Sequence, residues 1–277
     1  MSISQATKQR QDRIMHELLQ RRHVTVRELS STLEVSEATV RRDLKSLADR
    51  QQLNLVHGGA TLQRNSDYSF QARQQRNLEP KRLIAALAAE RIGDGEQVFL
   101  DAGTTCFELA SLIQDRRGLS VLVNSARLAL EFDSPGVNVI MLGGQYRPDR
   151  MDTVGPITTS TLDQLRGYLA FIGADGMSMD FGPSASDIES AHLYRQVVNN
   201  AREAVLLADH SKFESAALFR IVEWDRIRCL MTDRRPPEAW VTFAAEHGIE
   251  LVYPEDHGLA PADQPMAVRS AATPTGT

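Results

Sequence analysis

The sequence predicts an α/β protein in two parts, a small helical N-terminal domain followed by a larger domain on a mostly parallel sheet. Two observations lead to this prediction. From Lys81 onward, continuous apolar runs alternate with amphipathic segments, which is typical of buried parallel strands joined by helices. Before Lys81, three short segments show apolar residues at helical spacing. A chain of 277 residues is long enough for one large or two ordinary domains.

Composition narrows the class of protein. Residues 1–13 are polar and lack the apolar core of a signal peptide, and no segment resembles a membrane span. The chain has two cysteines, which indicates no disulfide framework, so we expect a cytoplasmic protein. Residues 1–82 hold 15 Lys and Arg against 9 Asp and Glu, a net charge of +6, whereas the remainder holds 16 against 27, or −11. This asymmetry suggests that only the front meets a polyanion, although a chance imbalance of solvated faces is the alternative.

The first two helices are indicated by periodicity and by a cap. Residues 8–20 read as helix one, with apolar residues at helical spacing. Thr25 and Glu28 match a capping box for a second helix at about 26–33. The segment 24–26 is too short to be a sheet by itself, so we expect it to lead into this second helix.

The third helix carries the residues that we expect to meet DNA. Ser36 caps it, and the preceding turn completes a helix-turn-helix pattern over about residues 24–43. Such a helix lies in the major groove, where arginine suits guanine edges and phosphates and lysine suits phosphates. We expect Asp43 to pair with these cations or to orient one of them. With Ser36, the candidate DNA-binding residues on this helix are Thr39, Arg41, Arg42 and Lys45.

Residues 53–60 follow as a candidate wing, with Gly58 and Gly59 allowing a tight turn. His57 at its tip is either a contact to DNA or a plain surface histidine. The sequence thus predicts a winged helix-turn-helix domain over residues 1–62. We expect residues 63–80 to be a linker that becomes helical near its end, since Pro80 suits the first turn of a helix.

The second domain is expected to span residues 81–254, with a disordered tail over 255–277. Its expected strands lie at 98–100, 119–124, 137–142, 168–173, 204–208, 228–232 and 249–252. The helices between them are expected at 84–92, 106–114, 126–132, 158–165, 187–201 and 237–247.

Polar residues and glycines gather at five of the predicted strand ends, where open α/β sheets hold their ligands. At the first strand end, Gly103 lets the backbone approach a ligand, and two hydroxyls and free helix N–H groups follow it to hold an anion such as phosphate. The candidate effector-binding residues are Asp101, Gly103, Thr104, Thr105, Asn124, Ser125, Gly143, Gly144, Asp175, Gly176, Glu189 and Lys212.

Each of these features alone is weak, because a Gly-Thr-Thr turn is usually a helix cap and Gly-Gly is usually a turn. Together they predict a pocket for a small polyhydroxy anion, with Asp175 and Glu189 accepting from sugar hydroxyls and Lys212 as the countercharge. Structural pairing of Lys212 with Asp209 is the alternative.

Two other reactive side chains receive structural interpretations. Cys106 has no histidine placed by the sequence to activate it, so we interpret it as a buried apolar cysteine. His192 is interpreted as a surface or packing residue rather than a catalytic one. The seven histidines show no metal-site spacing, and we expect no metal and no cofactor.

Both halves of the chain resemble the DeoR family of bacterial transcriptional regulators. The front match is VSEATVRRDLKSL followed by HGGA, and the back match is LDAGTT, VNS, LGG, IGADG and DHSKF in that order, covering roughly residues 8–253. The resemblance implies a repressor, less often an activator, that responds to a phosphorylated sugar or sugar derivative in carbon catabolism. It also implies a second domain similar to ribose-5-phosphate isomerase, in which Gly103, Thr104 and Thr105 take the phosphate-loop role.

The chain departs from the family pattern in three places. The family wing usually has a glycine and an arginine before HGGA, whereas QQLNLVHGGA has neither, so we expect weaker wing contact with phosphate. Pro80 stands where an acidic residue is common. The segment FGPSASDIES is an unusual approach to the helix of Glu189, and we expect it to shape effector specificity.

The leading hypothesis is a regulator that binds double-stranded operator DNA under the control of this effector, as a homo-oligomer, dimer or tetramer, assembled through the α/β domain. A rival is a sugar-phosphate isomerase with a DNA-binding head, in which Asp175 and Glu189 shuttle protons. An isomerase has no use for a DNA reader, however, and the region around Glu189 lacks the glycine-rich stretch of those enzymes. A purely architectural DNA binder would leave the five polar strand ends unexplained.

Overall fold

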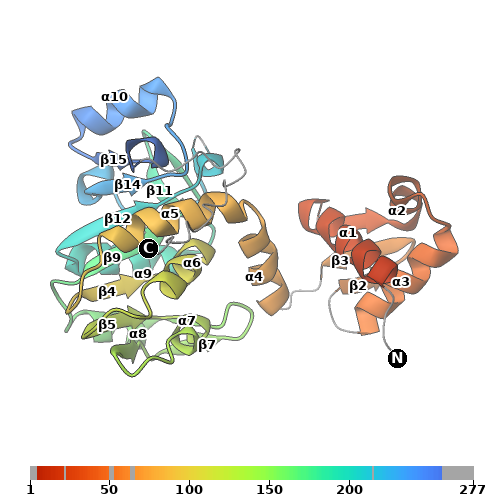
Figure 1. Cartoon of the computed structure of the whole chain (residues 1–277), viewed down its shortest axis with the longest axis horizontal. Helices are drawn as coiled ribbons and strands as arrows, with labels where there is room; N and C mark the ends of the chain where they lie inside the picture. The colour runs from red at the N-terminus through yellow and green to blue at the C-terminus, as the bar shows by residue number, and fades with distance from the viewer. Residues whose placement is uncertain (1–4, 22, 50–52, 63–65, 214, 258–277) are drawn as a thin grey trace, which may run out of the picture. The chain divides into compact units, whose positions relative to one another are not determined.

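The computed structural model describes residues 5–21, 23–49, 53–62, 66–213 and 215–257, with the elements labelled in Figure 1. The chain divides into two compact units, one of residues 1–76 and 148–150 and the other of residues 77–147 and 151–277. None of the helices in the described part of the chain has the length and apolarity that a membrane crossing needs.

The first unit contains three helices around a small antiparallel sheet of strand order β1-β3-β2, followed by a further helix. The capping box of Thr25 and Glu28 is confirmed, since Glu28 N donates to Thr25 Oγ1 at 3.2 Å and the Glu28 carboxylate accepts from Thr25 N at 2.9 Å. The elements are α1 (Gln5–Arg21), β1 (His23–Thr25), α2 (Val26–Leu33), α3 (Glu37–Asp49), β2 (Leu53–Val56), β3 (Gly59–Leu62) and α4 (Ser66–Gln75).

Strand β1 corrects the expectation that residues 24–26 only lead into a helix. Three residues cannot form a sheet alone, but the wing hairpin offers an edge with which they pair. Val24 lies opposite Ala60, and both side chains are buried in the core of this unit. Gly59 is required here, because a Cβ at this position would lie 2.1 Å from the Val24 carbonyl oxygen.

Asp43 also differs from its expected role as a partner of the cations on its own helix. Its carboxylate is buried and accepts from Arg10 Nε at 2.5 Å and from Gln11 Nε2 at 3.4 Å, both on α1. The reason is helical spacing, since position 43 lies on the inward stripe beside Val40 and Leu44. Asp43 therefore fixes α1 to α3, and its hydrogen bond raises the pKa of Arg10.

The second unit is built on a seven-stranded sheet of order β15-β14-β12-β9-β4-β5-β6, in which every pairing is parallel. The predicted strands and helices are present within a few residues of their expected bounds, except that α5 begins at Leu78 and not at residue 84. The strands are β4 (Gln97–Leu100), β5 (Leu119–Val123), β6 (Val137–Met141), β9 (Leu169–Gly173), β12 (Glu203–Leu207), β14 (Cys229–Met231) and β15 (Glu250–Val252). The helices are α5 (Leu78–Glu90), α6 (Thr104–Leu112), α7 (Ala126–Glu131), α8 (Pro156–Leu162), α9 (Ile188–Asn200) and α10 (Glu238–Glu246).

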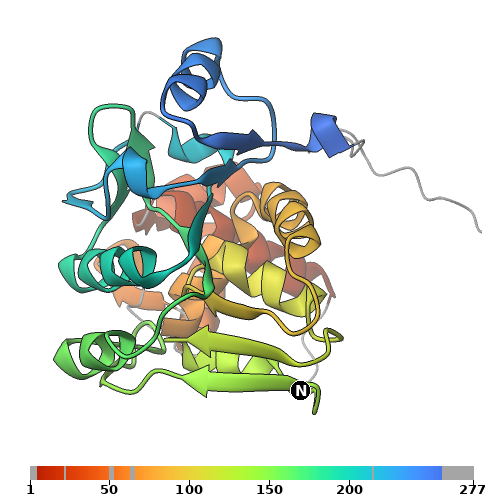
Figure 2. The same ribbon diagram turned by 90° about the vertical axis from the view of Figure 1, so that its left-hand side faces the viewer.

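Both faces of this sheet are covered, which is why its strands read as continuous apolar runs. Along β4, Val98 and Leu100 pack in one core with α5, α6 and α7, whereas Phe99 points into the other core with α8 and α9. Figure 2 shows α8 (green) and α9 (teal) on one side of the strands and α5 (gold) on the other. The unit is thus a doubly wound sheet.

The strand order reverses between β4 and β9, so the topological switch point lies at the carboxyl ends of these two strands. Three insertions follow the carboxyl ends of sheet strands: the hairpin β7 (Gln145–Arg147) and β8 (Asp152–Val154), the hairpin β10 (Gly176–Ser178) and β11 (Gly182–Ala185), and the strand β13 (Phe219–Arg220). These strands of two to four residues are too short for periodicity to reveal.

Two expectations at the borders of the domains also change. Helix α4 begins at Ser66, so the stretch expected to be a linker is helical well before its end. The expected tail 255–277 begins inside a short 3-10 helix, η3 (Pro254–His257), and residues 258–277 lie outside the described residues.

We predict that Asp43→Ala lowers the free energy of unfolding of the first unit by about 1–3 kcal/mol, because the half-buried Arg10 guanidinium loses its partner. Differential scanning calorimetry of the full chain measures this as a lowered transition temperature. Glu37→Ala removes the exposed partner of Arg41 and is the control, with an expected change below about 1 kcal/mol. Equal shifts in the two variants would contradict the role given to Asp43.

Candidate functional site

Helix α3 presents a polar, cationic outer face. Ser36 caps it, since its Oγ accepts from Thr39 N at 3.3 Å and lies 2.9 Å from Thr39 Oγ1. Arg41, Arg42 and Lys45 are exposed. Arg41 is paired with Glu37 at 2.6 Å, an exposed contact that a DNA phosphate can displace at small cost. The helix therefore offers cations and hydroxyls from one surface, as major-groove readers do.

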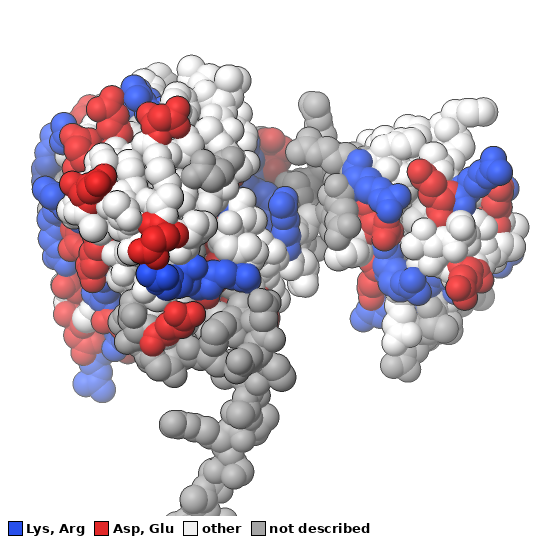
Figure 3. Space-filling model, turned by 90° about the horizontal axis from the view of Figure 1, so that it is seen from above, with Lys and Arg blue, Asp and Glu red and all other residues white. Residues whose placement is uncertain are grey.

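The wing adds little charge to this surface. His57 is exposed in the turn between β2 and β3, where Gly58 adopts a positive φ of 75°. Its neighbours Leu55 and Val56 are exposed and apolar. Figure 3 shows that acidic and basic side chains intermingle on the visible face of each unit, so the positive net charge of the front does not form a uniform basic face in that view. Contact with DNA must therefore depend on particular residues.

Asp101 joins the two strands at the switch point. Its carboxylate is 3% exposed and accepts from Gly103 N at 2.7 Å and from Gly173 N at 2.5 Å, at the carboxyl ends of β4 and β9. A Cβ at Gly103 would lie 2.6 Å from Asp101 Oδ1, so only glycine fits there. Burial raises the pKa of Asp101, against the opposing effect of the two amides. The carboxylate is thus occupied by backbone, whereas the sequence suggested an effector ligand.

Directly after Asp101 and its hydrogen bonds to the two strand ends, α6 begins without a side-chain cap. Gly103 is its N-cap residue in an extended conformation, and Thr104 and Thr105 form the first turn. The first N–H groups of a helix have no partner within the helix, so they are available to an anion together with the two threonine hydroxyls. Thr104 is buried and Thr105 is half-buried. This arrangement suits a small phosphate better than an extended polyanion.

Two buried side chains interact with Asp101 or with its neighbour Ala102. Tyr194 of α9, which sequence reasoning missed, is hydrogen-bonded to the backbone of Ala102, and burial together with Asp101 and Asp152 raises its pKa. Its only sequence signal was an apolar position on a helix. Cys106 is buried, its Sγ donates to Phe171 O at 3.5 Å, and burial raises its pKa. The interpretation of Cys106 as a buried apolar cysteine is confirmed.

The next strand end places Asn124 in a fully buried position. Its Nδ2 donates to Thr153 O at 3.1 Å, whereas its Oδ1 has no hydrogen-bond donor among the described residues. A buried amide oxygen without a donor is unfavourable, so this atom is suited to accept from a ligand hydroxyl. Ser125 differs, because its Oγ accepts from Leu128 N at 3.3 Å and caps α7.

Two of the three predicted glycines at the next strand ends are required by close packing. Gly143 accepts from Thr158 Oγ1 at 2.7 Å through its carbonyl, and a Cβ at Gly144 would lie 2.0 Å from that same hydroxyl oxygen. A Cβ at Gly176 would lie 1.5 Å from Ser215 O. These contacts explain Gly144 and Gly176 without a ligand, whereas a Cβ at Gly143 would meet no atom within 4 Å. The part of all three in effector binding stays a prediction.

The remaining candidates lie at the ends of β9 and β12. Asp175 is exposed and accepts from Ser186 N at 2.7 Å, and Glu189 is exposed in the first turn of α9. Lys212 Nζ contacts the Asp175 carbonyl oxygen at 3.5 Å. Asp209 instead accepts from Ser211 and Asn77, so the alternative Lys212–Asp209 pair is not formed. Burial raises the pKa of Asp209, but these hydrogen bonds and the Lys212 charge outweigh it and lower the pKa.

Arg147 is a second residue that sequence reasoning missed. It forms a bidentate pair with Asp152, at 2.8 and 2.6 Å, and also contacts Asp187 Oδ1 at 2.8 Å and Ser190 Oγ at 3.1 Å. Burial opposes its charge, but Asp152 and Asp187 raise its pKa. Arg147 thereby ties the β7–β8 hairpin to the first turn of α9, where Glu189 lies. Its partners are 5 and 40 residues away, which leaves no local signal in the sequence.

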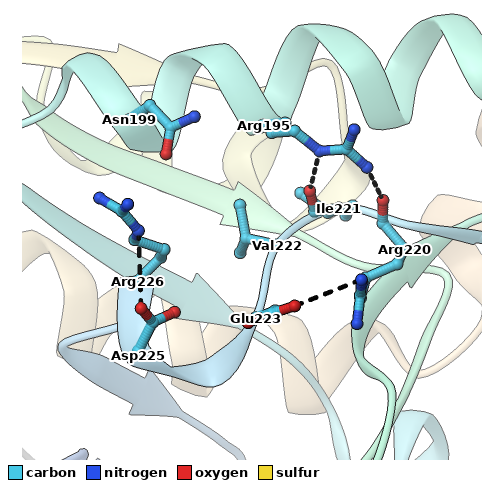
Figure 4. A pocket seen from close by; sticks show the side chains of 8 residues that line it. All are labelled: Arg195, Asn199, Arg220, Ile221, Val222, Glu223, Asp225 and Arg226. Atoms are coloured by element: carbon cyan, nitrogen blue, oxygen red, sulfur yellow. Dashed lines mark hydrogen bonds and ion pairs between the residues drawn. The ribbon is translucent and has the colours of Figure 1, made fainter.

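A cavity of about 300 Å³ lies elsewhere, between α9 and the segment after β13 (Figure 4). Arg195 donates there to the carbonyls of Ile221 and Arg220, and Arg220 and Arg226 pair with the neighbouring Glu223 and Asp225. Its cations are thus occupied, and none of the predicted site residues lines it. The switch point is the better candidate.

Comparison with known proteins agrees with a division into an N-terminal helix-turn-helix domain and a C-terminal sensor domain. A family profile described as "DeoR C terminal sensor domain" matches residues 76–234, and one described as "DeoR-like helix-turn-helix domain" matches residues 10–66. The chain belongs to the DeoR family of transcriptional regulators.

Its relatives include the transcriptional repressor CsqR of Escherichia coli (strain K12), 29% identical over 92% of this chain and 99% of that protein. The repressor GlcR of Bacillus subtilis (strain 168) is 31% identical over 87% of this chain and 94% of that one. Ribose 5-phosphate isomerase A from Methanocaldococcus jannaschii aligns over 50% of this chain and 55% of the isomerase, with 19% identity and a TM-score of 0.36. That structural likeness is too distant to bear on function.

For the sensor unit we predict that Asp101→Asn lowers the free energy of unfolding by about 1–3 kcal/mol, because an amide NH₂ would face one of the two glycine N–H donors. Urea unfolding of the full chain measures the change. The control is Asp94→Asn, an exposed carboxylate that accepts from Arg117 N at 2.9 Å, with an expected loss below about 1 kcal/mol. A loss of stability for Asp101→Asn no greater than that of the control would contradict the role of Asp101 in joining the ends of β4 and β9.

Proposed function

We propose that this regulator represses an operon for catabolism of a sugar or sugar derivative, and that a phosphorylated sugar at the switch point weakens its hold on operator DNA. The observation that carries the proposal is the presence, in one chain, of a capped cationic helix and of an uncapped helix N-terminus at the switch point. The relatives named as repressors support the sign of the regulation. Because its partner is operator DNA, it acts in the cytoplasm.

On DNA, α3 enters the major groove. Arg42 and Lys45 reach bases or phosphates directly, and Arg41 exchanges Glu37 for a phosphate. Ser36 and Thr39, at the start of the helix, lie where hydroxyls contact the backbone of the duplex. Two-fold operators require two reading heads, so the active form is a homodimer or a tetramer.

In the sensor unit, the first turn of α6 takes the phosphate through its N–H groups and through Thr104 and Thr105. Asn124 Oδ1 accepts from a sugar hydroxyl, because this buried oxygen is otherwise without a donor among the described residues. Asp175 and Glu189 accept from further hydroxyls, and Lys212, whose Nζ contacts the Asp175 carbonyl oxygen, supplies the countercharge. Both carboxylates are exposed, and Asp175 already accepts from Ser186 N, which suits binding better than proton transfer. We therefore propose a sensor and not an enzyme.

For the reader, Arg41→Ala with Arg42→Ala should weaken binding to DNA enriched from a random pool by the wild-type protein at least about 100-fold, since one cation at a base is worth about 1–3 kcal/mol. Gel shifts at fixed salt measure this loss. Arg21→Ala, an exposed arginine on α1, is the matched control and should change binding by less than about threefold. Unaltered gel shifts of the double variant would rule out α3 as the reading helix.

For the sensor, Thr104→Ala with Thr105→Ala should leave DNA binding intact and abolish the thermal shift that a matching sugar phosphate produces in the wild-type protein. The physical reason is mass action, because a ligand stabilises only the state that binds it. A screen of pentose, hexose and triose phosphates by thermal unfolding provides the measurement. Ser111→Ala, on the exposed far end of the same helix, should keep the full shift. A full shift in the double threonine variant would refute the phosphate loop.

A further inference from the structure

Asn77 lies where the chain passes from the first unit into the second, between the end of α4 at Gln75 and the start of α5 at Leu78. Its backbone is left-handed, with φ 54° and ψ 43°, a conformation that asparagine tolerates better than most residues. It occupies the N-cap position of α5, yet its side chain makes no capping bond. An asparagine at that position usually caps the helix, so this side chain serves another contact.

That contact is with the end of β12, 132 residues further along the chain. Asn77 Nδ2 donates to Asp209 Oδ1 at 2.9 Å and to Ser211 Oγ at 3.2 Å. Asp209 is 3% exposed, and the same Oδ1 also accepts from Ser211 N at 2.9 Å and Ser211 Oγ at 2.5 Å. Asn77 is therefore one of a small set of donors that satisfy a buried carboxylate, and losing it leaves that charge less well compensated.

The turn that follows Asp209 is connected to the rest of the carboxyl edge. It is the 3-10 helix η1 (His210–Lys212). His210 donates through its backbone N to Asp233 Oδ1 at 2.6 Å, and its Nδ1 lies 2.8 Å from Asp233 Oδ2, after β14. Lys212 contacts the Asp175 carbonyl after β9. A shift in η1 therefore reaches the ends of three strands and the junction residue Asn77.

We propose that Asn77 is the positioning residue that couples the β12-end loop to DNA binding. The inference rests on the proposed function, because Lys212 and Asp175 belong to the candidate effector site. With Asn77 bound to Asp209, the backbone at the start of α5 is fixed, and this is the state that binds the operator. An anion that attracts Lys212 and the Ser211 hydroxyl weakens the hydrogen bonds of Asn77 to Asp209 and Ser211, so that residue 77 is no longer fixed. Coupling of this kind requires the two states to differ in their affinity for DNA.

The test measures DNA affinity in the full-length protein with variants at both ends of the contact. The probe is DNA enriched from a random pool by the wild-type protein, with affinities read by fluorescence anisotropy. Asn77→Gly removes the side chain and keeps the left-handed backbone accessible. Asn77→Asp keeps the size and places a second carboxylate against Asp209. Each single variant should bind about tenfold more weakly, within the usual range of coupling between sites.

The exchanged pair, Asn77→Asp with Asp209→Asn, reverses donor and acceptor and should restore affinity to within about threefold of wild type. A residue that only stabilised the fold would lower the unfolding temperature of the single variants and leave their DNA affinity, measured well below that temperature, like the wild type. The matched control is Glu79→Gln, an exposed residue in the same first turn of α5, which should bind DNA like the wild type.

Three results would overturn the inference. Wild-type affinity in both single variants would show that the contact is not coupled to DNA binding. Weak binding that the exchanged pair does not restore would show that the effect does not pass through Asp209. A wild-type protein that enriches no DNA would refute the proposed function itself, and the coupling with it, which separates that failure from the other two.

Discussion

The Asp101 carboxylate is the interaction on which the sensor unit depends most. It lies at the one place where the strand order of the sheet reverses, and it holds the ends of β4 and β9 together through two backbone amides. A buried carboxylate is unfavourable unless such donors satisfy it. Its presence requires glycine at position 103, and that glycine leaves the first turn of α6 without a side chain over its N–H groups. The contact that joins the two strand ends and the uncapped N–H groups at the start of α6 therefore have one cause.

The other strand ends follow the same physical logic. Two further loops at the carboxyl edge are held by a buried or half-buried charged group with good hydrogen bonds, Arg147 for the β7–β8 hairpin and Asp209 for the turn after β12. Such groups give directional contacts that apolar packing does not provide. They also make the edge responsive, because a ligand that competes for one donor alters a network and not a single bond.

Much of the fold could be predicted from the sequence because the two strongest signals are local. Continuous apolar runs located all seven strands of the large sheet, and the Thr25–Glu28 box located α2. The hairpins after the strand ends and the strand β1 escaped prediction, since they form only when a distant segment supplies a partner. Asp43 was misread for a similar reason: its cationic neighbours in sequence are on the outer face, whereas its partner Arg10 is on another helix.

The position of the candidate residues at one edge of the sheet was predictable, since the carboxyl ends of parallel strands lie at the same edge. The contacts of the individual residues were not predictable, because the Asp101 and Ser125 side chains accept hydrogen bonds from backbone N–H groups, and Tyr194 and Arg147 had no local signal.

We propose above all that binding of a phosphorylated sugar at this edge is thermodynamically linked to DNA release. Isothermal titration of the sugar phosphate found by thermal shift, into the free protein and into the DNA-saturated protein, tests it most directly. We predict weaker binding to the DNA complex, by the same factor by which the sugar phosphate weakens DNA binding. Equal affinities in the two titrations would contradict it.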